Sequence, residues 1–112
     1  MKIAIVMMAL LAGAPPADDG AQELIRKGRH AFNLKQYDVA IGHLQKAYEI
    51  STKADVLYML AQVYRQKGSC EEALHFYKRY KSDCRDDCKL NTRTDDLIKE
   101  TAAQCETKRA MV

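Results

Sequence analysis

An internal repeat limits the fold of this chain more than any other feature of its sequence. Residues 21–52 superimpose on residues 54–82 when the numbering is shifted by 33 positions. The shift aligns Leu24 with Leu57, Gly28 with Ala61, Ala31 with Tyr64, Ala40 with Ala73, Ile41 with Leu74, and Leu44 with Tyr77. A period of roughly 20–50 residues is typical of stacked repeats, in which each unit buries its apolar face against its neighbour.

Each unit has the hydrophobic spacing of two helices. In the first unit, apolar residues recur at helical spacing from Leu24 to Phe32 and restart at Val39, on the far side of a polar interruption. In the second unit Gly68 separates the two apolar stretches, and glycine is the usual residue just past a helix end. The small residues at the aligned positions allow two antiparallel helices to approach closely.

The pattern resembles the tetratricopeptide repeat, a helix–turn–helix unit of about 34 residues. The matching residues are Leu24, Gly28, Tyr37, Ala40, Leu44 and Ala47 in the first unit, and Leu57, Leu60, Ala61, Tyr64, Gly68, Ala73 and Tyr77 in the second. Thr52 departs from the pattern where the family usually has proline, and Tyr80 replaces a small residue. Parts of the chain are also similar to short secreted repeat proteins of Gram-negative bacteria.

One more helix is expected after a polar loop. Thr94 is the predicted N-cap, and Asp95 and Asp96 suit the positive end of the helix dipole. A narrow apolar stripe follows, as expected of a terminal helix that covers the last exposed core of a repeat stack. The predicted fold is all-α, a short α-solenoid of two helix hairpins and a C-terminal capping helix. Its parts are repeat one at 21–52, repeat two at 54–82, a loop at 83–91 and the cap at 92–109, within a domain at 18–112.

The first residues have the layout of a secretory signal peptide. Lys2 is followed by an apolar run at residues 3–12 and then by small and polar residues. We therefore expect residues 1–17 to be a signal peptide, although the cleavage point is open. The run is too short to span a membrane comfortably, so no integral span is expected in the mature chain. The prediction is an exported protein, periplasmic or extracellular.

Export favours disulfides for the four cysteines. Cys70 begins the second helix of repeat two, about 18 Å of helix rise from Ser82. An antiparallel cap rises about 16 Å from Thr94 to Cys105, which brings Cys105 back to the level of Cys70. These levels favour a Cys70–Cys105 disulfide and a Cys84–Cys88 disulfide in the loop. Four cysteines allow three connectivities, and the main rival pairs Cys84 or Cys88 with Cys105.

Two other uses of the cysteines were weighed. A structural zinc site needs four closely paired ligands, but Cys70 and Cys105 have no adjacent partners in the sequence. A catalytic redox pair is usually C-x-x-C at a helix start, whereas Cys84 and Cys88 are more widely spaced and lie among aspartates. No metal site and no cofactor are therefore expected.

The function is predicted from the family resemblance and from the lack of nucleic-acid-binding and catalytic signatures in the sequence. The net charge is +3 and the charges are interspersed, so no basic footprint for nucleic acid is present. No catalytic motif was found, and we do not expect an enzyme. The resemblance implies a module that binds a protein or peptide in a groove lined by the first helix of each repeat. Its groove residues would be Ile25, Arg29, Phe32, Tyr58, Gln62 and Arg65.

Two alternatives stay open at this point. The chain could be a structural or oligomerising envelope protein, because exposed ends of repeat stacks can pair symmetrically. A thiol–disulfide oxidoreductase using Cys84 and Cys88 is the other, less favoured, reading.

Overall fold

A computed structural model of the chain describes residues 17–85, 88–89 and 93–111. The predicted signal peptide lies outside these residues, except for Ala17. The described part contains five helices and no strand, which confirms the all-α prediction. The helices are α2 (Ala17–Asn33), α3 (Tyr37–Ser51), α4 (Ala54–Lys67), α5 (Cys70–Cys84) and α6 (Thr94–Ala110).

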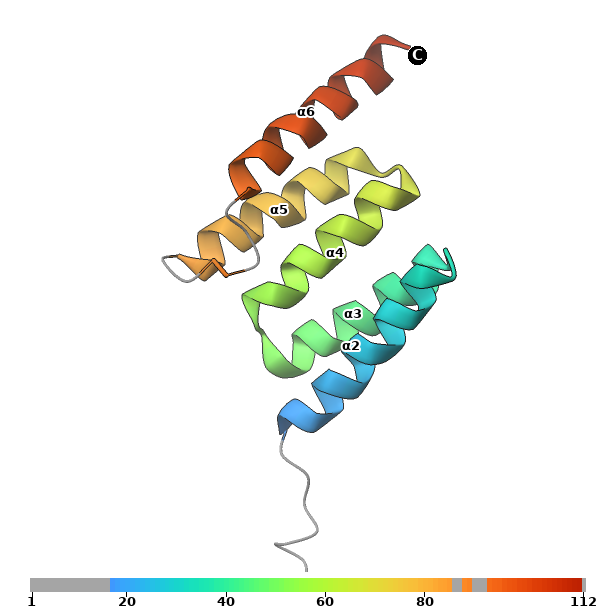
Figure 1. Cartoon of the computed structure of the whole chain (residues 1–112), viewed down its shortest axis with the longest axis vertical. Helices are drawn as coiled ribbons and strands as arrows, with labels where there is room; N and C mark the ends of the chain where they lie inside the picture. The colour runs from blue at the N-terminus through green and yellow to red at the C-terminus, as the bar shows by residue number, and fades with distance from the viewer. Residues whose placement is uncertain (1–16, 86–87, 90–92, 112) are drawn as a thin grey trace, which may run out of the picture.

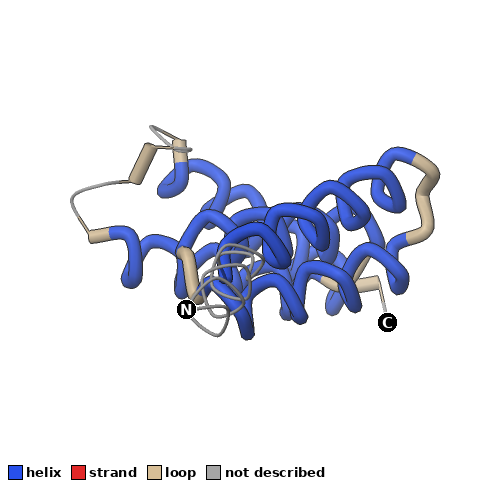
Figure 2. The backbone as a smooth tube through the Cα atoms, turned by 90° about the horizontal axis from the view of Figure 1, so that it is seen from below, coloured by secondary structure: helices blue, strands red, loops and turns tan. Residues whose placement is uncertain are grey.

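Consecutive helices pack against one another in chain order. α2 with α3 and α4 with α5 form two hairpins, α3 joins the hairpins, and α6 packs on α5 (Figure 1). Seen from below, the helices lie side by side and the described loops lie at their ends (Figure 2). This arrangement brings α2 and α4, the first helices of the two hairpins, onto one side of the stack.

Left-handed residues end the helices before two of the tight connections. Gly68 has a φ of 95° and caps α4, so the helix stop expected at this glycine is confirmed. Thr52 adopts the same left-handed region at the end of α3, with a φ of 50°. A threonine there carries a steric cost that glycine would avoid.

Small residues set the spacing within the first hairpin. A Cβ atom built on Gly28 would lie 2.9 Å from Leu44 Cγ and 3.5 Å from the carbonyl oxygen of Ala40. α2 therefore contacts α3 so closely that even a methyl group at this position would require Leu44 to shift. The largest core cluster extends from this contact through three helices and consists of Ile25, Ala31, Ala40, Ile41, Leu44, Ala47, Val56, Leu60 and Val63.

Two smaller clusters continue the core toward the C-terminus. Tyr80 is fully buried with Leu57 and Cys84. The departure of Tyr80 from the repeat pattern is accommodated because its ring packs edge-on to Tyr58, with the ring centroids 5.3 Å apart. The other cluster joins α4, α5 and α6 and consists of Ala61, Ala73 and Tyr77, with Leu97 and Ile98 packed against it.

Element boundaries differ slightly from the expectation. α5 continues to Cys84, beyond the predicted end of repeat two, and α6 begins at Thr94 instead of residue 92. Thr94 is not the N-cap: that position belongs to Arg93, whose side chain makes no capping hydrogen bond. The Thr94 hydroxyl is instead buried, without a hydrogen-bond partner among the described residues.

The membrane expectation can be compared with the helices in the described ranges. None of these helices is both long and apolar enough to cross a bilayer.

Candidate binding groove

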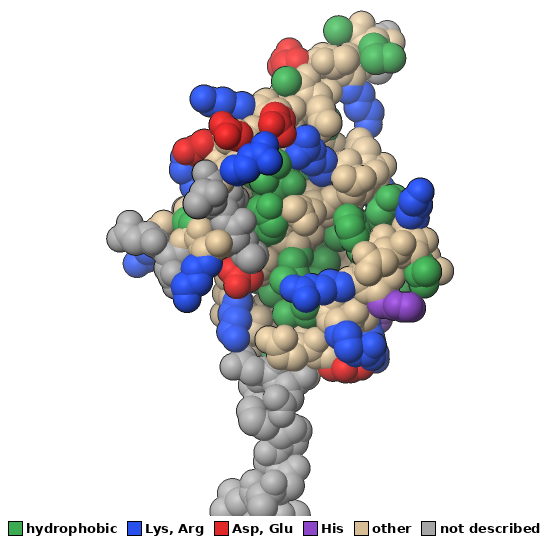
Figure 3. Space-filling view, viewed as in Figure 1, with side chains coloured by type: hydrophobic (Ala, Val, Ile, Leu, Met, Phe, Trp, Pro, Cys, Tyr) green, Lys and Arg blue, Asp and Glu red, His purple; other side chains and the backbone are tan. Residues whose placement is uncertain are grey.

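A surface hollow of about 290 Å³ lies between α2 and α4. The lining side chains combine aromatic, thioether, amide and guanidinium groups. They belong to Gly28, Arg29, Phe32, Asn33, Leu44, Tyr58, Met59, Gln62 and Val63. Figure 3 shows one face of the molecule, on which hydrophobic side chains are exposed near the middle with Lys and Arg side chains beside them.

Most of the predicted groove residues meet at this hollow. Arg29 and Phe32 of α2 face Tyr58 and Gln62 of α4 across it. Ile25 does not line it: this predicted groove residue is 8% exposed and packs in the largest core cluster.

Arg65 lies in an adjoining hollow of about 130 Å³ together with Phe32, Gln62, Gln66 and Tyr77. Because Phe32 and Gln62 line both hollows, the two form one groove that runs from Arg29 toward α6. At the α6 end, Arg65 donates hydrogen bonds to Gln104 (3.3 Å) and to Glu100 (3.4 Å). Arg65 is therefore partly neutralised by the cap.

Arg29 is a cation that lines the main hollow. Its side chain is exposed, and it has no ion-pair partner among the residues that the structure describes. A guanidinium group with unused donors can bind a carboxylate through two parallel hydrogen bonds. This end of the groove can therefore accept an acidic group.

Tyr58 is fixed in place by its neighbours. Its ring lies edge-on to Tyr77, with a centroid distance of 5.7 Å, and its hydroxyl accepts a hydrogen bond of 3.0 Å from Gln62. Burial raises the pKa of the Tyr77 hydroxyl above its usual value, and a hydrogen bond from Arg65 partly opposes the rise. An aromatic surface held in this way loses little conformational entropy when a partner covers it.

Sequence reasoning missed Met59 and Val63, which line the floor of the hollow. They are four residues apart on α4 and so share one face of that helix. Their spacing is compatible with groove-lining positions, but it is equally compatible with core positions, and Val63 does belong to the largest core cluster.

The cysteines form two disulfides, Cys70–Cys105 and Cys84–Cys88, with Cα atoms 5.4 Å and 5.1 Å apart. These are the pairs favoured from the helix levels. Cys84 is the last residue of α5 and packs against Leu57 and Tyr80. The negative end of the helix dipole disfavours a thiolate there, which is the opposite of what a catalytic cysteine requires.

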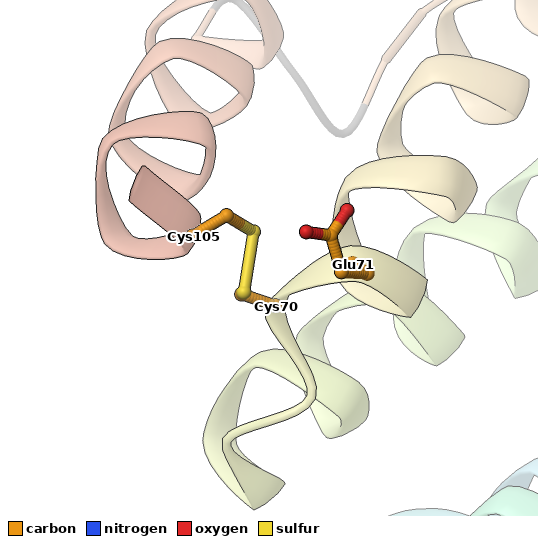
Figure 4. A group of neighbouring side chains, drawn as sticks. All are labelled: Cys70, Glu71 and Cys105. Atoms are coloured by element: carbon orange, nitrogen blue, oxygen red, sulfur yellow. A yellow bond between two sulfur atoms is a disulfide. The ribbon is translucent and has the colours of Figure 1, made fainter. Parts of the chain in front are cut away.

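One group of potential metal ligands occurs within the described ranges. It consists of Cys70, Cys105 and Glu71, whose ligand atoms lie within 4.8 Å of one another (Figure 4). Both sulfur atoms are joined to each other, so neither is a thiolate that could bind a metal ion.

Comparison with known proteins gives no name to the groove. No protein-family model matches the chain, and no curated protein is significantly similar to it.

Proposed function

We propose that the chain is an exported binding module of the tetratricopeptide type. Its groove between α2 and α4 would bind a peptide or a helix of another protein. The observation that carries this proposal is the composition of the groove, where Phe32, Tyr58 and Met59 lie beside Arg29, which has no ion-pair partner in the described ranges. Aromatic residues, methionine and arginine are enriched at protein–protein interfaces, and tyrosine and arginine are frequent hot spots.

The size of the groove supports a protein segment as the ligand. Small-molecule sites usually enclose about 300–1,000 Å³ and cover most of the ligand. The main hollow, at about 290 Å³, is at the lower end of that range and continues into a second hollow. One or two side chains of a bound segment would enter it, while the rest of the segment lies over α2 and α4.

Two features support export to an oxidising compartment. The first is the apolar run near the N-terminus, which has the layout of a signal peptide. The second is the pairing of all four cysteines in disulfides. Disulfides persist outside the cytoplasm because no reducing system keeps thiols free there.

The test begins with selection of peptides from a displayed random library on the immobilised, oxidised protein. Binding of a selected peptide is then measured for the original chain and for Arg29→Glu. We expect at least about 10-fold weaker binding by this variant, because a hydrogen bond to a charged group contributes about 1.5–3 kcal/mol.

Lys46→Glu is the matched control. Lys46 is exposed on α3, which packs behind α2 in Figure 1, and the substitution makes the same change of charge. The control should bind as the original chain does. Equal binding by all three proteins, or equal weakening by both variants, would exclude the groove as the binding site.

A further inference from the structure

α6 has a small apolar face for a helix that closes the core. Its two large aliphatic side chains, Leu97 and Ile98, pack against the cluster around Tyr77 but are not fully buried. The fully buried residues of its middle and C-terminal half are Thr101 and Cys105. Hydrophobic burial is roughly proportional to the apolar area removed from water, so packing holds α6 weakly.

The polar contacts of α6 lie mostly at the surface. Arg109 pairs with Glu71 at 2.8 Å, and Lys108 donates a 2.8 Å hydrogen bond to the carbonyl oxygen of Gly68. Lys81 of α5 pairs with Asp95 near the opposite end of α6. Exposed ion pairs add little to stability because water and salt screen them. The strongest single link between α6 and the rest of the fold is therefore the Cys70–Cys105 disulfide.

This disulfide borders a surface hollow of about 430 Å³. Cys105 is 1% exposed, whereas Cys70 is only partly buried and starts α5 (Figure 4). Of the two cysteines, Cys70 is therefore the more accessible to an external thiolate. After reduction, Cys70 would lie at the positive end of the α5 dipole, in a hollow whose charged lining is mixed: Lys108 and Arg109 favour a thiolate there, and Glu71 and Glu72 oppose it.

We propose that α6 is a detachable cap, and that the Cys70–Cys105 disulfide is its latch and a thiol–disulfide exchange site for an external dithiol. One thiolate of the dithiol attacks Cys70 Sγ and forms a mixed disulfide. Cys105 leaves as a thiolate and takes up a proton from water. The second thiolate of the reductant then displaces Cys70, so the dithiol becomes a disulfide and two electrons pass to the protein.

Opening the latch alters the groove. When α6 leaves α5, Glu100 and Gln104 no longer hold Arg65, and the buried Tyr77 becomes accessible. Arg65 and Tyr77 line the end of the groove that faces α6, so the released state has a longer groove in which Arg65 is no longer held by Glu100 and Gln104. This inference goes beyond the proposed function, and its test requires no ligand.

The test is hydrogen–deuterium exchange on Cys84→Ser/Cys88→Ser, in which Cys70–Cys105 is the remaining disulfide. The oxidised variant is compared with the same variant reduced by dithiothreitol, and alkylation with mass analysis verifies the thiol state. We expect the protection of α6 amides to fall roughly 100-fold or more on reduction, because the bond closes an interval of 35 residues. The protection of α2, α3 and α4 should not change.

Cys70→Ser/Cys105→Ser, with Cys84–Cys88 intact, provides the matched comparison. Its α6 should exchange rapidly both with and without reductant. Three results would overturn the proposal: unchanged α6 protection after reduction, loss of protection throughout all five helices, or failure of dithiothreitol to reduce the bond in the native protein. The second would make the bond a staple of the whole fold instead of a latch.

Discussion

The packing of α2 on α3 can be tested by adding a single methyl group. In Gly28→Ala, the new Cβ would lie 2.9 Å from Leu44 Cγ and 3.0 Å from Leu44 Cδ2. Leu44 is 2% exposed and belongs to the largest core cluster, so it has little room to move. Overpacking of a core costs about 1–3 kcal/mol. This cost is partly offset, because alanine inside a helix is more stabilising than glycine by about 0.5–1 kcal/mol. The expected result is a net loss of about 1 kcal/mol in the free energy of unfolding.

Gly42→Ala is the matched control because Gly42 lies inside α3 with no atom within 4 Å of the new methyl group. It should gain about 0.5–1 kcal/mol from helix propensity alone. The two variants should thus differ by about 2 kcal/mol. With a denaturant slope of about 2 kcal/mol per molar urea, this difference separates their unfolding midpoints by about 1 M. Urea titrations followed by circular dichroism would measure it.

A further variant identifies the contact itself. Leu44→Ala in the Gly28→Ala background should recover the overpacking cost, which appears as a coupling of at least about 0.5 kcal/mol in a double-mutant cycle. If Gly28→Ala stabilises the protein as much as Gly42→Ala does, the close approach of α2 and α3 is wrong.

Three other predictions concern single residues. The pKa of Tyr77 is raised in the folded state, so the unfolded chain releases this proton at a lower pH than the native protein does. The free energy of unfolding should therefore fall as the pH rises from about 10 through the folded-state pKa. Urea titrations across this range should show a smaller fall for Tyr77→Phe, and an equal fall would contradict the raised pKa. Gly68→Ala should lower the free energy of unfolding by about 1 kcal/mol, because Gly68 has a φ of 95°. Gly68→Asn should lower it less, because asparagine tolerates left-handed backbone angles. Equal losses of stability in thermal unfolding would contradict this prediction. Thr94→Val removes a buried hydroxyl that has no partner among the described residues and should raise the unfolding free energy by about 1 kcal/mol, whereas a decrease would mean that the hydroxyl is hydrogen-bonded.

The hairpins could be predicted because local signals agree with the repeat. Apolar spacing of three to four residues defined the helices, and Gly68 marked a turn that requires a left-handed residue. Helix rise alone then placed Cys105 at the level of Cys70, the pair that the structure joins. The helices and the turn depend on spacing along the chain, and the cysteine pair needed only the rises of two helices and their antiparallel order.

The groove was harder to predict because it depends on contacts between helices. Ile25 and Phe32 lie on the same apolar face of α2, but only Phe32 reaches the hollow, while Ile25 is covered by the core. Arg65 is held by Glu100 and Gln104, which are 35 and 39 residues away in the chain. Periodicity shows which face of a helix is apolar. It does not show how far along that face a neighbouring helix extends.

Amide chemical-shift mapping with a library-selected peptide would show whether the groove between α2 and α4 binds a protein segment. The chain has 112 residues, a size suited to residue-by-residue nuclear magnetic resonance. We expect the largest shifts around Arg29, Phe32, Tyr58 and Gln62, with smaller shifts toward Arg65. Shifts concentrated on the exposed faces of α3 and α5, with these residues unchanged, would contradict it.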